Sequence, residues 1–137
     1  MTEYFHYKGS VCNVNYHFVW VTKYRRQVLT FPEEVKVLLQ NICAKQGWAI
    51  KALEVMPDHV HIFITTPPVF APSQIVKFLK GTTGRQIFLA HPELKTLLRK
   101  GHLWSPSYYC GTVGTVSAET VRLYIEMQKQ GGTSSPD

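Results

Sequence analysis

The chain has 137 residues, which is the length of one ordinary domain. It contains 15 Lys and Arg against 9 Asp and Glu, so its formal charge is +6 at pH 7, and 45% of its residues are hydrophobic. This hydrophobic share suffices for a buried core and excludes a wholly disordered chain. The sequence has no run of ~20 apolar residues that could span a membrane, and its first ten residues lack the apolar core of a signal peptide. We therefore expect a cytoplasmic protein with no membrane partner, and the positive charge favours a polyanion such as nucleic acid.

The three cysteines, Cys12, Cys43 and Cys110, lie far apart and form no CxxC pair. In a chain without a secretion signal, such a sparse, odd-numbered set predicts reduced thiols that serve in packing. A structural zinc site is not expected.

The first predicted elements are a strand and a helix. Large apolar residues alternate with period two over Asn13–Tyr24, which indicates a strand with one buried face. Thr30 followed by Glu33 is a capping-box pattern, and Pro32 suits a first helical turn. We expect this helix to end at Gly47.

The later elements predict the fold class. They are strands over Trp48–Met56 and His59–Thr66 joined by a turn at Pro57-Asp58, helices over Ser73–Ala90 and Glu93–Lys100, a strand over Trp104–Val113, and a helix capped by Ser117 that runs to about Gln130. This order predicts an α+β fold of ferredoxin-like (RRM-like) type, with helices packed against an antiparallel sheet. We expect one domain over residues 1–130 and a disordered tail over 131–137.

The sharpest motif is His59-Val60-His61 within a predicted strand. Alternate residues of a strand share a face, so the two imidazoles project together while Val60 and Ile62 point to the core. Neighbouring imidazoles can hold a divalent metal through neutral ring nitrogens. The pattern also fits two surface histidines on the solvated face of a sheet.

A second motif pairs Tyr124 with Gln128 on the last helix, where residues four apart share a face. The phenol could act as a nucleophile and the glutamine oxygen as a further metal ligand. A phenol with a pKa of about 10 needs a neighbouring cation or base to act at neutral pH. A rim aromatic beside a solvated glutamine is the alternative interpretation.

Basic residues cluster in two places. On the predicted helix over Ser73–Ala90, one face is apolar (Ile75, Val76, Leu79, Thr83 and Ile87) and the other carries Lys77, Lys80, Gly81, Gly84 and Arg85. A second group, Lys23, Tyr24, Arg25 and Arg26, follows the first strand. The glycines would let a phosphate backbone or another helix lie close to the main chain, although an ordinary solvated face fits as well. Trp104, Tyr108 and Tyr109 could stack on unpaired bases or belong to the core.

Taken together, the segments MPDHVHIFI, LKGTTGRQ, LWSPSYY, TVG and VRLYIEMQ resemble a known family in their order and spacing. The family is that of the single-tyrosine HUH transposases, the IS200-like TnpA enzymes of the smallest bacterial and archaeal insertion sequences. The resemblance extends from about Asn13 to Gln130.

The resemblance implies a transposase that cleaves and rejoins single-stranded DNA at the ends of an insertion sequence. His59, His61 and Gln128 would be ligands of Mg²⁺ or Mn²⁺, and Tyr124 would attack a phosphodiester to give a 5′-phosphotyrosine and a free 3′-hydroxyl. No nucleotide cofactor is implied.

The resemblance also implies a homodimer that binds DNA hairpins. The tyrosine helix of one chain can complete the histidine site of the other, with Gly111 and Gly114 as hinge points. The matching positions make Lys77, Lys80, Arg85 and the segment Lys23–Arg26 the candidate DNA surface.

Two other functions stay open. One is a non-enzymatic nucleic-acid-binding module on the same kind of sheet. The other is a different HUH nuclease, although the short chain and single tyrosine helix argue against it. Fold alone does not choose between these functions.

Overall fold

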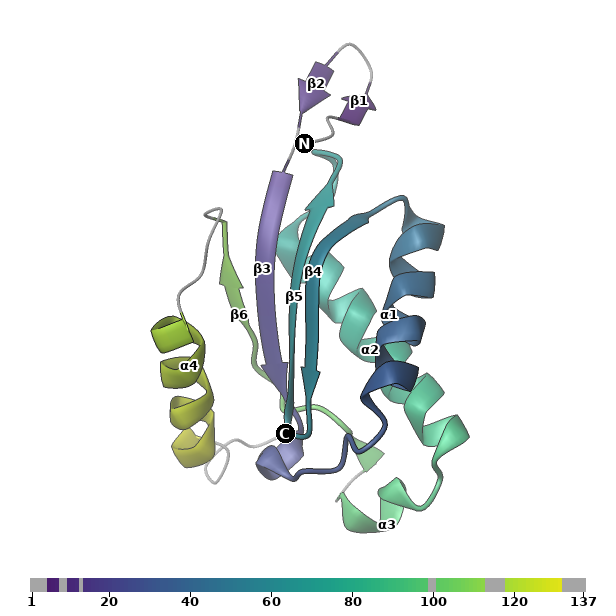
Figure 1. Cartoon of the computed structure of the whole chain (residues 1–137), viewed down its shortest axis with the longest axis vertical. Coiled ribbons are helices and arrows are strands. Elements are labelled where there is room, and N and C mark those ends of the chain that lie inside the picture. The colour runs from purple at the N-terminus through teal and green to yellow at the C-terminus, as the bar shows by residue number, and fades with distance from the viewer. Residues whose placement is uncertain (1–4, 8–9, 13, 99–100, 113–117, 132–137) are drawn as a thin grey trace.

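The structure is a computed structural model that describes residues 5–7, 10–12, 14–98, 101–112 and 118–131 (Figure 1). Its elements in chain order are β1 (Phe5–Tyr7), β2 (Ser10–Cys12), β3 (Val14–Val21), the 3-10 turn η1 (Lys23–Arg25), α1 (Pro32–Gln46), β4 (Ala49–Met56), β5 (His59–Thr66), α2 (Pro72–Ala90), α3 (Leu94–Leu97), β6 (Tyr109–Gly111) and α4 (Ala118–Gly131). Among these described residues, no helix is both long and apolar enough to cross a membrane.

Four strands form one antiparallel sheet in the order β4-β5-β3-β6, and β1 and β2 form a separate two-stranded ribbon. The register places His61 of β5 between Val19 of β3 and Glu54 of β4. α1 and α2 lie on one side of the sheet, whereas α4 lies beside β6 on the other (Figure 1). The predicted α+β class, with helices on an antiparallel sheet, is confirmed.

The core lies between the sheet and the helices α1 and α2. Alternate residues of β3 (Tyr16, Phe18 and Trp20) and of β5 (Val60, Ile62 and Ile64) enter it. All five residues predicted for the apolar face of α2 are buried there. Each large side chain removed from water contributes about 1.5–3 kcal/mol, so this face fixes how α2 lies on the sheet.

Both cysteines whose side chains the structure describes are free thiols. Cys43 is buried in the core cluster, and this burial raises the pKa of its thiol to about 12. Cys110 is partly buried and packs against the same cluster. Both serve in packing, as predicted. The side chain of Cys12 lies outside the described part of the chain.

The sequence predicted β4, β5 and α2 to within a residue or two, but the start of α1 differs. Thr30 and Glu33 do not form the expected capping box, because Phe31 is the N-cap and makes no side-chain cap bond. The amide of Thr30 instead donates to the carbonyl of Val28 in the preceding turn. The C-terminal prediction is confirmed: Gly47 ends α1 with a left-handed φ of 77°.

Three other predicted boundaries are wrong. β3 ends at Val21 because η1 follows, and the second helical segment shortens to α3. Among the described residues of the predicted strand over Trp104–Val113, only Tyr109–Gly111 form a regular strand. Upstream of β6 the chain turns toward α2, since Lys80 Nζ binds the carbonyls of Ser105 and Ser107. The predicted cap Ser117 and the tail beyond 131 lie outside the described residues.

Candidate functional site

His59 and His61 project from the sheet face opposite the core, as predicted, because Val60 and Ile62 are fully buried on the other face. Both imidazoles line a cavity of about 540 Å³ between the sheet and α4. The remaining lining residues are Arg25, Glu54, Asp58, Val121, Arg122, Ile125 and Glu126. The cavity thus combines imidazoles, carboxylates and guanidinium groups on one side of the sheet.

Asp58, in the turn before β5, forms hydrogen bonds with two side chains of this cavity. Its Oδ1 lies 2.9 Å from His59 Nδ1, and its Oδ2 lies 3.1 Å from Arg25 Nε. We assign the proton to His59 Nδ1, because a carboxylate only accepts hydrogen bonds. This tautomer leaves the Nε2 lone pair available, which is the usual way in which a carboxylate orients a metal-binding histidine.

His61 has a third imidazole as its neighbour. His61 Nε2 lies 3.3 Å from Nδ1 of His17, a buried β3 residue whose ring stacks on Phe63 with centroids 4.0 Å apart. Burial lowers the pKa of His61, and the His17 imidazole lowers that pKa further. The neutral imidazole, which is the form that binds metals, is therefore favoured.

The histidine pair has the donor chemistry of a divalent-metal site, because two imidazoles project together and Asp58 orients one of them. In the described part of the chain, no group of three or more His, Cys, Asp or Glu side chains could hold a metal ion. The predicted ligand Gln128 lies on α4, but its side chain is outside the described residues.

Tyr124 lies on the side of α4 that faces the β6 segment. Its hydroxyl is 2.9 Å from Ser107 Oγ, and its ring centre is 6.2 Å from that of Tyr109. Burial raises the pKa of Tyr124 to about 12, although the Ser107 hydrogen bond opposes part of that rise. The structure thus brings α4 beside the histidines, but Val121 and Ile125, not Tyr124, line their cavity.

Gly111 has a packing role in this segment. A Cβ at this position would lie 2.7 Å from the hydroxyl oxygen of Tyr109, whose ring covers the glycine. Space for that ring is a physical reason for glycine here, separate from the predicted hinge. Gly114, the other predicted hinge, lies outside the described residues.

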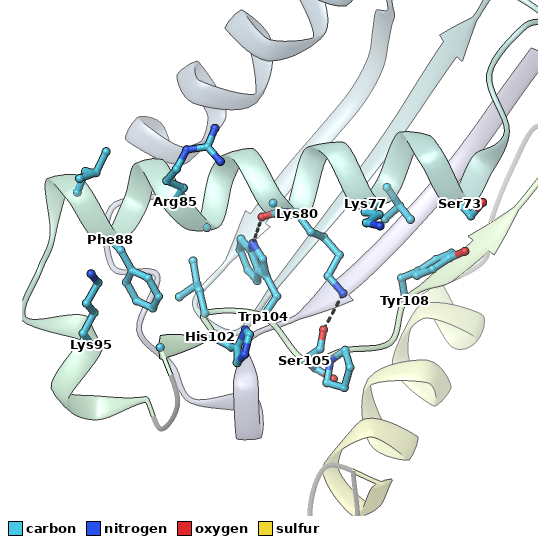
Figure 2. Close-up of a pocket in the computed structure, with 17 residues that line it drawn as sticks. Ser73, Lys77, Lys80, Arg85, Phe88, Lys95, His102, Trp104, Ser105 and Tyr108 are labelled. Carbon is cyan, nitrogen blue, oxygen red and sulfur yellow. Dashed lines mark hydrogen bonds between the residues drawn. The ribbon is translucent and has the colours of Figure 1, made fainter. Parts of the chain in front are cut away.

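A second, larger cavity of about 870 Å³ lies between α2 and the segment that precedes β6 (Figure 2). Lys77, Arg85 and Tyr108 line it and are exposed. Its wall is held by Trp104, whose Nε1 lies 3.0 Å from the Lys80 carbonyl and 3.1 Å from Thr83 Oγ1. The described cavity therefore combines an apolar wall with exposed cations, which suits a nucleic acid.

Lys80 is used inside the protein. Its ammonium donates to the carbonyl of Ser105 at 2.6 Å (Figure 2). It also donates to the carbonyl of Ser107 at 3.1 Å. Burial lowers the pKa of Lys80 to about 8, so the group is still mostly protonated at pH 7. Lys80 thereby fixes the segment that carries Ser107, the partner of Tyr124.

A pair of substitutions on α2 tests this structural role. We expect Lys80→Met to lower the free energy of unfolding at pH 7 by about 1 kcal/mol, because two carbonyls lose their donor. Lys77→Met, which changes an exposed lysine on the same helix, should change it by less than about 0.5 kcal/mol. Urea unfolding measures both values, and equal stability of the two variants would contradict the assignment.

The segment Lys23–Arg26 differs from a simple basic patch. The Lys23 side chain is buried, whereas Tyr24 and Arg26 are exposed. The Tyr24 ring has Lys23 Nζ at 5.5 Å and the Arg26 guanidinium carbon at 6.0 Å from its centroid. Arg25 turns the other way, into the histidine cavity. Of the predicted surface group, Tyr24 and Arg26 are therefore the residues that face solvent.

Some site residues were not predicted in these roles. The sequence analysis did not single out His17, Asp58 or Ser107. His17 alternates with core residues of β3, which places it on the non-core face, but its neighbour depends on which strand pairs with β3. Asp58 immediately precedes the His-x-His motif, and this adjacency was the available signal.

The sequence is similar to those of known transposases. The family model described as "Transposase IS200 like" matches residues 10–128. The chain is 41% identical over 123 residues to the ISDra2 transposase TnpA of Deinococcus radiodurans, covering 88% of each chain. It is 30% identical over 118 residues to the IS200 transposase of Salmonella typhimurium, covering 85% of this chain and 77% of the relative.

Solved structures share the fold. A transposase crystal structure from Deinococcus radiodurans matches with a TM-score of 0.83 at 39% identity and covers 90% of this chain and 96% of its own. A REP-associated tyrosine transposase bound to a REP hairpin matches with a TM-score of 0.53 at 18% identity, over 99% of this chain and 81% of its own. The family match spans most of the sequence, and the chain therefore belongs to the IS200-like transposase family.

Proposed function

We propose that this transposase cleaves and rejoins single-stranded DNA at insertion-sequence ends through a covalent bond to Tyr124. The observation that carries the proposal is the histidine pair, in which Asp58 orients His59 and which lies in a cavity lined also by the helix that bears Tyr124. Such a pair at a cavity suits phosphoryl transfer better than a purely structural role does. The element order β3-α1-β4-β5-α2-β6 and the sheet order support a ferredoxin-like scaffold for it.

The proposed reaction is a transesterification. The Tyr124 oxygen bonds to phosphorus, the bond from phosphorus to the 3′ oxygen breaks, and the 3′-hydroxyl leaves with a proton. The reverse reaction rejoins strands without ATP, because the phosphotyrosine conserves the bond. His59, His61 and Gln128 would hold Mg²⁺ or Mn²⁺, which supplies Lewis-acid stabilisation of the phosphoryl oxygens.

We further infer that the enzyme acts as a homodimer with shared sites. Within one chain the Tyr124 hydroxyl is bound to Ser107 and does not line the histidine cavity. An α4 helix from the partner subunit would bring a tyrosine to that cavity from a different direction. Either this exchange or a rotation of the chain's own α4 must release the Ser107 hydrogen bond before attack.

The DNA ligand we propose is a hairpin with single-stranded flanks, as the hairpin-bound relative suggests. The exposed cations Lys77, Arg85 and Arg26 would contact its phosphates, and Tyr24 and Tyr108 offer exposed rings for unpaired bases. Lys23 and Lys80 would support this surface from within rather than contact DNA, since their side chains are engaged or buried.

The cations of α2 allow a direct test of this surface. We expect the double variant Lys77→Ala with Arg85→Ala to reduce the slope of log affinity against log salt concentration by about 1.5, since two phosphate contacts are lost. Fluorescence anisotropy with a hairpin from the flanking DNA measures this slope. The charge-matched control is Lys45→Ala with Lys51→Ala, two exposed lysines that line neither cavity. An unchanged slope in the α2 variant would contradict the assignment.

The proposed activity is tested with single-stranded oligonucleotides from the DNA that flanks the gene. With Mg²⁺ or Mn²⁺ we expect a free 3′-hydroxyl fragment and a second fragment that stays attached to protein after denaturation. The same sequence as a perfect duplex should not be cleaved. Tight hairpin binding without any cleavage would instead support the non-enzymatic binding module.

A further inference from the structure

We propose that Arg25 is a further catalytic residue, which binds a non-bridging oxygen of the scissile phosphate. Asp58 would be the positioning residue that holds Arg25 and His59 at a fixed separation. The inference rests on the proposed function, because it assigns a role within the same cavity. It separates Arg25 from the general DNA surface on which the sequence placed it.

The backbone at this position is strained. Tyr24 and Arg25 have φ values of 58° and 53°, in the left-handed region that non-glycine residues rarely adopt. Two consecutive residues of this kind persist only where surrounding contacts enforce them, and such strain concentrates at functional sites. Here the strain directs the Arg25 side chain into the histidine cavity while Tyr24 and Arg26 remain exposed.

The contacts that enforce this turn come from two distant segments and from the turn itself. The Thr22 amide donates to the carbonyl of Asp58 at 3.0 Å, and the Lys23 amide donates to that of Leu103 at 2.8 Å. The Thr22 hydroxyl closes the turn by donating to the Arg26 carbonyl at 2.6 Å. The turn that carries Arg25 is thus bonded to the turn that immediately precedes the His-x-His motif.

The Arg25 guanidinium group has hydrogen-bond partners within the described structure for only some of its N–H donors. Its Nε donates to Asp58 Oδ2 at 3.1 Å, and 24% of the side chain is exposed. Its Nη1 is buried and has no hydrogen-bond partner among the residues that the structure describes. A buried cationic N–H group without a partner is costly, and an anionic oxygen in the cavity would satisfy it.

A phosphate is the anion that best fits this arrangement. Arginine presents several N–H donors in one plane, so Nε can remain on Asp58 while the Nη groups bind a phosphoryl oxygen. Negative charge on the non-bridging oxygens is what such a donor stabilises during phosphoryl transfer. The other cavity arginine, Arg122, is less suited, because its more exposed side chain pairs with Glu119.

The experiment measures metal-free binding of single-stranded DNA in EDTA. Two strands are compared, one with the normal phosphate at the cleaved linkage and one with an uncharged methylphosphonate there. We expect the wild-type protein to bind the normal strand about tenfold more tightly, a typical gain for one charge-assisted contact. Arg25→Ala should bind both strands equally, whereas the control Lys45→Ala should keep the wild-type preference.

The preference of Arg25→Ala decides the proposal. If that variant still prefers the normal phosphate tenfold, the proposal is overturned. Should it fail to fold, as judged by circular dichroism, Arg25→Lys replaces it, and we expect that variant to cleave at least about tenfold more slowly. Cleavage by Arg25→Lys at the wild-type rate would equally overturn the role. A wild-type protein that forms no DNA adduct would refute the proposed function itself, which separates the two failures.

Discussion

Replacing Tyr124 by Phe is expected to abolish DNA cleavage and adduct formation while leaving hairpin binding within about twofold of wild type. The variant keeps the aromatic ring but removes the oxygen that would attack phosphorus, and loss of a nucleophile typically costs more than about 10³-fold in rate. The lost hydrogen bond to Ser107 should cost only about 1 kcal/mol of stability. Single-turnover cleavage and anisotropy measure the two quantities.

The matched control for this variant is Tyr16→Phe. Tyr16 is a buried tyrosine of the core, where burial also raises the pKa of its phenol, but it lies on the opposite face of the sheet. This variant should cleave at the wild-type rate. Cleavage by Tyr124→Phe would show that another group is the nucleophile.

Replacing both His59 and His61 by Ala is the second change with a large expected effect. Metal-dependent cleavage should fall below detection, because no imidazole would remain on β5 to bind the divalent ion. Stability should fall by only about 1–2 kcal/mol, since the variant loses the hydrogen bonds to Asp58 and His17 but no core side chain. Calorimetric titration with Mn²⁺ should show the loss of binding independently of activity.

His91→Ala is the control for the loss of histidine. His91 lies after α2, pairs with Glu34 at 3.0 Å and lines neither cavity. Its variant should bind Mn²⁺ and cleave DNA as the wild type does. A double variant of His59 and His61 that still bound Mn²⁺ with wild-type affinity would place the metal elsewhere.

Local sequence patterns were sufficient to predict the central strands and the face of the sheet on which His59 and His61 lie. The alternation in β5 places Val60 and Ile62 in the core, and this alone orients both histidines toward the other face. The apolar face of α2 could likewise be predicted, because all of its residues recur at helical spacing. In these segments local preference and tertiary packing agree.

The features that the sequence could not predict depend on contacts between distant segments. The sequence pattern predicts that Lys80 is a surface cation, but its ammonium donates to the carbonyls of Ser105 and Ser107. The left-handed backbone of Arg25 depends on hydrogen bonds between its turn and distant segments. No glycine at this position indicates that conformation in the sequence. The direction of Tyr124 depends on how α4 rotates against the β6 segment, which the spacing of Tyr124 and Gln128 cannot determine.

The most direct measurement of the central claim is to locate the covalent bond between protein and DNA. The protein is incubated with single-stranded end DNA and Mn²⁺, denatured, digested with trypsin and nuclease, and examined by mass spectrometry. The account predicts a nucleotide attached through its 5′ phosphate to the peptide that contains Tyr124. Attachment to Tyr108, Tyr109 or a residue other than tyrosine would contradict it.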